Sequence, residues 1–99
     1  MTKSKTDLKP ELIHAALSKA IQQRRFELGL SQDELARRTG MHRTYISDLE
    51  RRCRNFSIKI YLRLTVALEM TPSELMVEAE KIAASPQSKN IDSMKSAAH

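Results

Sequence analysis

The sequence predicts an all-α protein, a compact five-helix domain that spans residues 10–84. Three observations support this fold class. Apolar residues recur at helical spacing, a Ser or Thr followed three residues later by Glu twice marks a helix start, and both glycines stand where helical patterns end. A chain of 99 residues is long enough for one small domain with a modest core.

The first helix is expected from Pro10 to about Leu28, because proline is tolerated in a first turn and a glycine follows Leu28. Its apolar stripe consists of Ile13, Leu17, Ala20, Ile21 and Leu28. Phe26 falls off this stripe, so it is either an ordinary exposed aromatic or a contact residue. Residues 1–9 are polar and lack periodicity, and a disordered arm is expected there.

The second helix is expected from Gln32 to about Arg38. Ser31 and Glu34 have the spacing of a capping box, in which the hydroxyl accepts from a backbone N–H and the carboxylate accepts from the N–H of Ser31. Gly40 can adopt the positive φ that ends a helix and turns the chain sharply. The pattern therefore predicts a helix, a tight turn and another helix.

The third helix is expected from Arg43 to about Glu50. Ile46 and Leu49 are three residues apart, so they share a face and can pack on the second helix. The side chains left on the outer face are Arg43, Thr44, Tyr45, Ser47 and Asp48. A helix this short is not stable alone, so the rest of the domain must hold it in place.

A fourth helix is expected between Ser57, which can cap it, and about Leu68. Its apolar face is wider than one domain needs, so part of that face can pack on a partner. A fifth helix should end near Ala84, and its start is marked by Thr71, Pro72 and Glu74. Residues 85–99 have no helical stripe of useful length, and a disordered tail is expected.

The third helix suits the major groove of B-form DNA, which admits an α-helix and exposes base edges to polar side chains. Base contacts are predicted for Arg43, Thr44, Tyr45 and Ser47. Phosphate contacts, which set register without reading sequence, are predicted for Arg37, Arg38, Arg51, Arg52 and Arg54. Residues 37–54 hold six arginines and two acidic residues, so they supply four of the formal net charge of +5. The predicted partner is therefore double-stranded DNA.

Other classes of function have less support in the sequence. A single cysteine, Cys53, excludes an internal disulfide and is expected to be a small packed filler. The three histidines are far apart, so no metal site and no cofactor are expected. Asp48 and Glu50 lie two apart on a short helix and point to different faces, so pairing with arginines is expected rather than catalysis.

No small-molecule ligand motif is visible. The chain has neither an apolar run of membrane length nor an N-terminal segment of the secretory kind, so it is expected to be cytoplasmic and away from the membrane.

The segment from Leu30 to Arg54, LSQDELARRTGMHRTYISDLERRCR, resembles the Cro/C1-type (Xre-type) helix-turn-helix domain, which implies a lambda-repressor-like fold. Within it, the run HRTYISDLER resembles the controller proteins of restriction-modification systems. The resemblance implies a transcriptional regulator that binds a near-palindromic operator as a homodimer and controls a restriction-modification operon. It also implies DNA-backbone contacts for Gln32, His42, Arg54 and Asn55. The chain departs from the family pattern at Arg52 and Glu69, where glycine is common.

Dimerisation is expected through the fourth and fifth helices, because helix-turn-helix proteins usually bind half-sites about 34 Å apart as two-fold dimers. The expected interface residues are Met70, Leu75, Met76 and Ile82, which could instead complete the core of one protomer. A phage-type repressor or an antitoxin of the same fold remains an alternative. From another class, a protein-interaction adaptor without DNA specificity is possible, whereas RNA binding is disfavoured because the A-form major groove is too narrow for a helix.

Overall fold

The computed structural model describes residues 9–52 and 54–85, which form five helices and no strand. The helices are α1 (Pro10–Glu27), α2 (Gln32–Thr39), α3 (Arg43–Glu50), α4 (Ile58–Ala67) and α5 (Pro72–Ala84). The predicted all-α class is confirmed, and the helix ends agree with those expected to about one residue. The predicted arm (1–9) and the predicted tail (85–99) lie outside the described residues except at Lys9 and Ser85, and Cys53, with the role expected for it, lies outside them as well.

The predicted helix starts are confirmed by their hydrogen bonds. At the start of α2, the backbone N–H of Glu34 donates to Ser31 Oγ over 3.0 Å, and the N–H of Ser31 donates to Glu34 Oε1 over 2.8 Å. The hydrogen bond from this backbone N–H lowers the pKa of the Glu34 carboxyl. The same reciprocal pair joins Thr71 and Glu74 at the start of α5. Ser57 Oγ accepts from the N–H of Ile60 and so caps α4.

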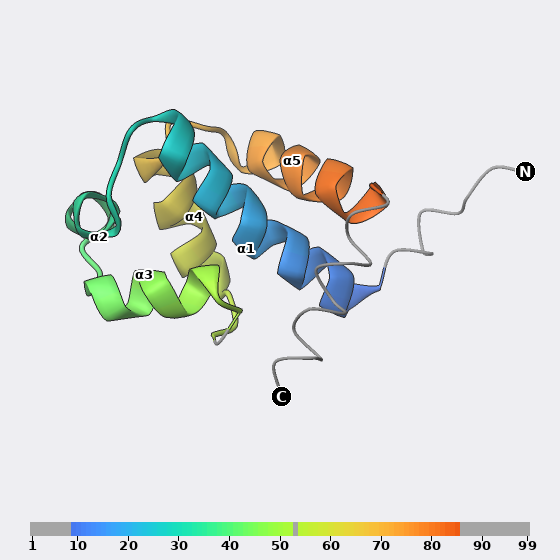
Figure 1. Ribbon diagram of the computed structural model, residues 1–99, viewed down its shortest axis with the longest axis horizontal. Helices are drawn as coiled ribbons and strands as arrows, with labels where there is room; N and C mark the ends of the chain where they lie inside the picture. The colour runs from blue at the N-terminus through green and yellow to red at the C-terminus, as the bar shows by residue number, and fades with distance from the viewer. Residues whose placement is uncertain (1–8, 53, 86–99) are drawn as a thin grey trace, which may run out of the picture.

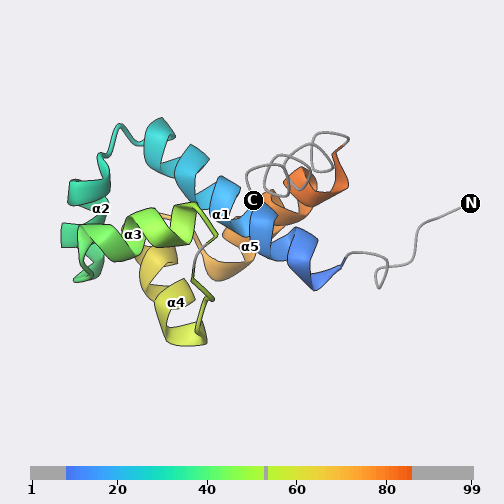
Figure 2. The same cartoon turned by 60° about the horizontal axis from the view of Figure 1, so that its bottom comes forward.

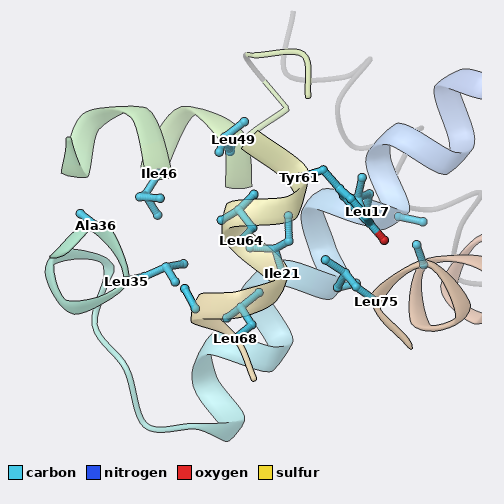
Figure 3. Packing of buried hydrophobic residues seen from close by; sticks show 14 of the residues in the cluster. Leu17, Ile21, Leu35, Ala36, Ile46, Leu49, Tyr61, Leu64, Leu68 and Leu75 are labelled. Carbon is cyan, nitrogen blue, oxygen red and sulfur yellow. The ribbon is translucent and has the colours of Figure 1, made fainter. Parts of the chain in front are cut away.

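The helices enclose one core that contains side chains from all five of them (Figure 3). α1 packs mainly against α5 and also contacts α3, while α2 packs against α3 and α4. Figure 1 shows α5 beside α1 along much of its length, and α3 at the lower edge of the molecule. The labelled core residues are Leu17, Ile21, Leu35, Ala36, Ile46, Leu49, Tyr61, Leu64, Leu68 and Leu75. As predicted, Ile46 and Leu49 of α3 face inward with Leu35 of α2.

One expected dimer residue belongs to the core. Leu75 has 0% of its surface exposed, so it offers nothing for a second protomer to contact. Met70, Met76 and Ile82 are half-buried and pack against the same core. Of the two roles left open by the sequence, the structure therefore assigns Leu75 to the core of the protomer. The α4–α5 junction is further held by the Tyr61 hydroxyl, which donates to the carbonyl oxygen of Pro72, and burial raises the pKa of this phenol.

A buried ion pair joins α1 to α3. Arg25 donates from Nε to Glu50 Oε2 over 2.7 Å and from Nη2 to Glu50 Oε1 over 2.9 Å, and the two side chains are 7% and 1% exposed. The third guanidinium nitrogen of Arg25 donates to the carbonyl oxygen of Leu30, and Gln32 Nε2 donates to Glu50 Oε1 over 3.1 Å. One polar cluster therefore connects α1, the α1–α2 loop, the start of α2 and the end of α3.

Two residues other than glycine have left-handed backbone angles in the described part of the chain. They are Arg52, with φ 65°, which follows α3, and Glu69, with φ 59°, which follows α4. These are the two positions at which the family resemblance leads us to expect glycine. A side chain at such an angle places Cβ close to the backbone, which costs about 1–2 kcal/mol relative to the right-handed conformation.

Removing one member of the buried ion pair should destabilise the domain strongly. Arg25→Met leaves the buried Glu50 carboxylate without its cation, and we expect the free energy of unfolding to fall by about 3–5 kcal/mol. Urea denaturation followed by circular dichroism measures the loss. The double variant Arg25→Met with Glu50→Leu buries no charge and should recover most of the stability. A double variant less stable than Arg25→Met would contradict this account.

Candidate nucleic-acid interface

The turn between α2 and α3 fixes the direction of α3. Gly40 has φ 73°, and the N–H of Met41 donates to the carbonyl oxygen of Ala36 over 3.0 Å. Thr39 is buried, and its hydroxyl lies within hydrogen-bond distance of the carbonyl oxygens of Leu35 and Ala36 at 2.9 and 3.0 Å. The positive φ, which glycine adopts at little cost, therefore ends α2 and starts α3 after a short turn.

Figure 2 shows that no other helix covers the outer side of α3. The side chains on that side are polar. Arg43 and Thr44 are exposed, and Tyr45 and Ser47 are half-buried. His42, just before the helix, is also exposed. The four residues predicted to contact bases thus lie on the first turns of one helix, and their contact with bases stays a prediction. Arg43 Nε lies 3.7 Å from Asp33 Oδ1 of α2, an exposed pair of the kind that contributes little to stability.

A second cluster lies at the C-terminal end of α3. Asp48 accepts from Arg51 Nη2 over 2.8 Å and from Arg54 Nε over 3.3 Å. Both bonds lower the pKa of the Asp48 carboxyl, and the bond from Arg51 has the larger effect. Partial burial of Asp48 opposes this shift. The guanidinium carbon of Arg54 lies 4.9 Å from the ring centroid of Tyr45, a cation–π distance. One carboxylate thus holds two predicted phosphate ligands beside a predicted base reader.

The loop after α3 is fastened to α1. His14 Nε2 lies 3.0 Å from the carbonyl oxygen of Arg54, and the rings of His14 and Phe56 meet edge to face with centroids 5.5 Å apart. Asn55 is exposed and lines a shallow hollow beside these rings. The loop that carries Arg54 and Asn55, two predicted backbone ligands, is therefore anchored at its backbone.

The other predicted phosphate ligands lie in different environments. Arg37 and Arg51 are exposed, and Arg52 is half-buried in its left-handed conformation. Arg38 Nη1 donates to the carbonyl oxygen of Ala67 over 3.0 Å and to Glu69 Oε2 over 3.1 Å, so its guanidinium joins α2 to the end of α4. Gln32 is tied to Glu50 through its amide nitrogen. Phosphate contact by each of these residues stays a prediction.

Arg25, which helps to organise this surface, was not singled out in the sequence, and the arginine partner expected for Glu50 was not identified as Arg25. Arg25 lies four residues after Ile21 and eight after Leu17, so it continues the apolar stripe of α1. Glu50 likewise lies four residues after the buried Ile46. A basic residue and an acidic residue on two inward stripes are the signal that could have revealed the buried pair.

Neither a metal-binding cluster nor a membrane-spanning helix is found among the described residues. Within 9–52 and 54–85, no group of three or more His, Cys, Asp or Glu side chains is arranged to hold a metal ion. None of the helices in these ranges has the length and apolarity required to cross a bilayer.

Comparison with known proteins gives one family. The helix-turn-helix family model matches residues 21–75. The chain is similar to the control protein C.BamHI of Bacillus amyloliquefaciens, with 43% identity over 47 residues, which are 48% of this chain and 58% of that protein. The chain spans little more than half the length of the curated control proteins that it matches.

Solved structures of the same kind match over nearly their whole length. The restriction-modification controller protein C.AhdI from Aeromonas hydrophila has 34% sequence identity and a TM-score of 0.61, over 68% of this chain and 98% of its own. The controller C.Esp1396I in a nucleoprotein complex has 31% identity and a TM-score of 0.68, over 75% of this chain and 95% of its own.

Proposed function

The chain belongs to the helix-turn-helix family, with restriction-modification controller proteins among its relatives, and on that premise we propose that it is a sequence-specific DNA-binding transcriptional regulator. It binds a near-palindromic operator as a homodimer and controls a restriction-modification operon, and it acts on DNA in the cytoplasm. The observation that carries this proposal is the outer side of α3, which is polar and uncovered while its inner side is fully buried.

The shape and chemistry of α3 support base reading in the major groove. Ile46 and Leu49 are 1% and 0% exposed, which fixes the rotation of the helix and leaves Arg43 and Thr44 outward. Arginine can donate two hydrogen bonds to guanine, and threonine can bond to several bases or contact the thymine methyl group. Because Gly40 and the α2–α3 turn place this end of α3 at the surface, it enters the groove first.

The arginines around α3 support phosphate binding. Arg37 lies on α2, and Arg51 and Arg54 follow α3, so positive charge is found at both ends of the recognition helix. Contacts of this type set the register of the protein on the duplex and make affinity fall as salt concentration rises. Arg38 contributes less, because it already binds the carbonyl oxygen of Ala67.

The homodimer is proposed to form through α4. Ile58, Leu62 and Val66 are spaced four residues apart on one face of this helix and are 75%, 44% and 78% exposed. A two-fold axis near Leu62 would place this stripe against its copy, with Ile58 opposite the partner's Val66. Removing these side chains from water stabilises association. This interface differs from the one expected from the sequence: Leu75 is enclosed in the core, and contact by Met70, Met76 and Ile82 stays a prediction.

Selection of bound duplexes from a random pool, followed by sequencing, tests the proposed function. A DNA regulator of this kind should return one motif with two inverted half-sites whose centres lie about 34 Å apart. A protein-interaction adaptor would enrich no motif. Such a result would overturn the proposal, whereas a motif without inverted symmetry would overturn only its dimeric form.

Arg43→Ala should weaken binding to the selected operator by about 1–3 kcal/mol and relax preference at one base position. Arg37→Ala is the matched control, because this exposed arginine lies on α2 and is expected to meet only phosphate. It should weaken operator and scrambled duplexes alike and reduce the salt slope by about 1. Titrations of both duplexes at two salt concentrations measure these effects. Equal losses on both duplexes for Arg43→Ala would contradict base reading.

Leu62→Glu should convert the dimer to a monomer, because it places a carboxylate at the centre of the apolar stripe and beside its symmetry copy. The side chain is 44% exposed, so the protomer itself should remain folded. Analytical ultracentrifugation gives the mass, and circular dichroism verifies the helical content. Val77→Glu is the control, since it adds the same charge at an α5 residue that is also 44% exposed, and it should leave the mass unchanged. A dimer that persists in Leu62→Glu would exclude α4 as the interface.

A further inference from the structure

We propose that Asp48 is a positioning residue for DNA recognition, which holds Arg51 at the end of α3 and Arg54 against Tyr45 and so raises the preference for the operator over other duplexes. This inference rests on the proposed function and concerns the same surface. Asp48 itself contacts no base in the proposal. Its effect passes through the three side chains that it orders.

The first step is the geometry of the carboxylate. Asp48 lies on α3, and its side chain is only 16% exposed, whereas the Arg51 and Arg54 side chains are 66% and 51% exposed. Each carboxylate oxygen meets a different arginine: Oδ1 lies 2.8 Å from Arg51 Nη2, and Oδ2 lies 3.3 Å from Arg54 Nε. A half-buried acid held on a helix thus fixes two longer side chains that extend into solvent.

The second step is the link from Arg54 to Tyr45. The guanidinium of Arg54 stacks 4.9 Å from the ring centroid of Tyr45, and the backbone carbonyl of Arg54 is within hydrogen-bond distance of His14. Arg54 is therefore held at its carbonyl oxygen, at Nε and at its guanidinium face. The stack in turn limits the rotamers of Tyr45, one of the residues proposed to meet the bases.

The third step is electrostatic. A carboxylate near a DNA-binding surface repels phosphates and lowers affinity for every duplex, whatever its sequence. Because the two arginines and Tyr45 are already ordered, they lose less conformational freedom when they bind a duplex whose groups match their arrangement. Only such a duplex gains from this order. Asp48 therefore exchanges general affinity for discrimination between sequences.

Asp48→Asn tests the inference, because the amide keeps the shape of the side chain and removes its charge. We expect the affinity for a scrambled duplex to rise about threefold and the operator-to-scrambled affinity ratio to fall roughly tenfold. Glu78→Gln is the matched control: this α5 residue pairs with Lys81 over 3.3 Å, and the substitution changes net charge equally. The control should leave the ratio within about twofold of the wild-type value. A ratio unchanged in Asp48→Asn, or changed equally in both variants, would overturn the inference.

A double-mutant cycle tests whether the effect passes through Arg54. Arg54→Lys keeps the charge but loses the planar group that stacks on Tyr45, so adding Asp48→Asn to it should lower the ratio by much less than tenfold. Asp48→Glu retains a carboxylate and should recover part of the ratio. Full additivity in the cycle would contradict a role through Arg54.

The two proposals fail in different ways. If wild-type protein shows no preference for any duplex, the proposed function fails. If it prefers the operator and Asp48→Asn keeps that preference, only the role of Asp48 fails. Thermal melting of each variant, expected within a few degrees of wild type, separates positioning from a loss of folding.

Discussion

The buried ion pair between Arg25 and Glu50 is the constraint on which the arrangement of this domain depends. A charge removed from water is very costly unless an opposite charge and hydrogen bonds meet it, and here each group satisfies the other. Because Arg25 also binds the Leu30 carbonyl and Glu50 also accepts from Gln32, the pair can form only when α1, α2 and α3 are all in place. The orientation of α3 at the surface is therefore tied to the scaffold helix.

Local chemistry allowed much of the fold to be predicted, and tertiary pairing accounts for the rest. The capping boxes at Ser31 and Thr71 depend on residues three positions apart, so sequence spacing reveals them directly. The partner of Glu50, Arg25, is 25 residues away in the sequence. The sequence alone does not show which of its several arginines Glu50 meets. Likewise, the side chains exposed along α3 follow from helical periodicity, but the link from Asp48 to Arg54 depends on the path of a loop that periodicity does not describe.

The fourth helix shows the same limit in another form. Its sequence is apolar on more than one side, and this pattern alone does not distinguish a wide buried face from a buried face plus an exposed one. The structure separates them: Leu64 is fully buried, whereas Ile58 and Val66 are largely exposed. Since the two faces share one short helix, changes that rotate α4 to improve the core would also misalign the proposed subunit contact. Folding and the proposed assembly would therefore constrain the same ten residues.

The left-handed residues Arg52 and Glu69 have a consequence for how this protein can change. Each holds a backbone conformation that glycine adopts at little steric cost, and Glu69, which follows α4, also accepts a hydrogen bond from Arg38 of α2. Replacing Glu69 by glycine would therefore relieve the backbone strain at this position, which is one route to higher thermal stability. Because the same change removes an acceptor of Arg38, a proposed phosphate ligand, thermal stability and DNA affinity would change together.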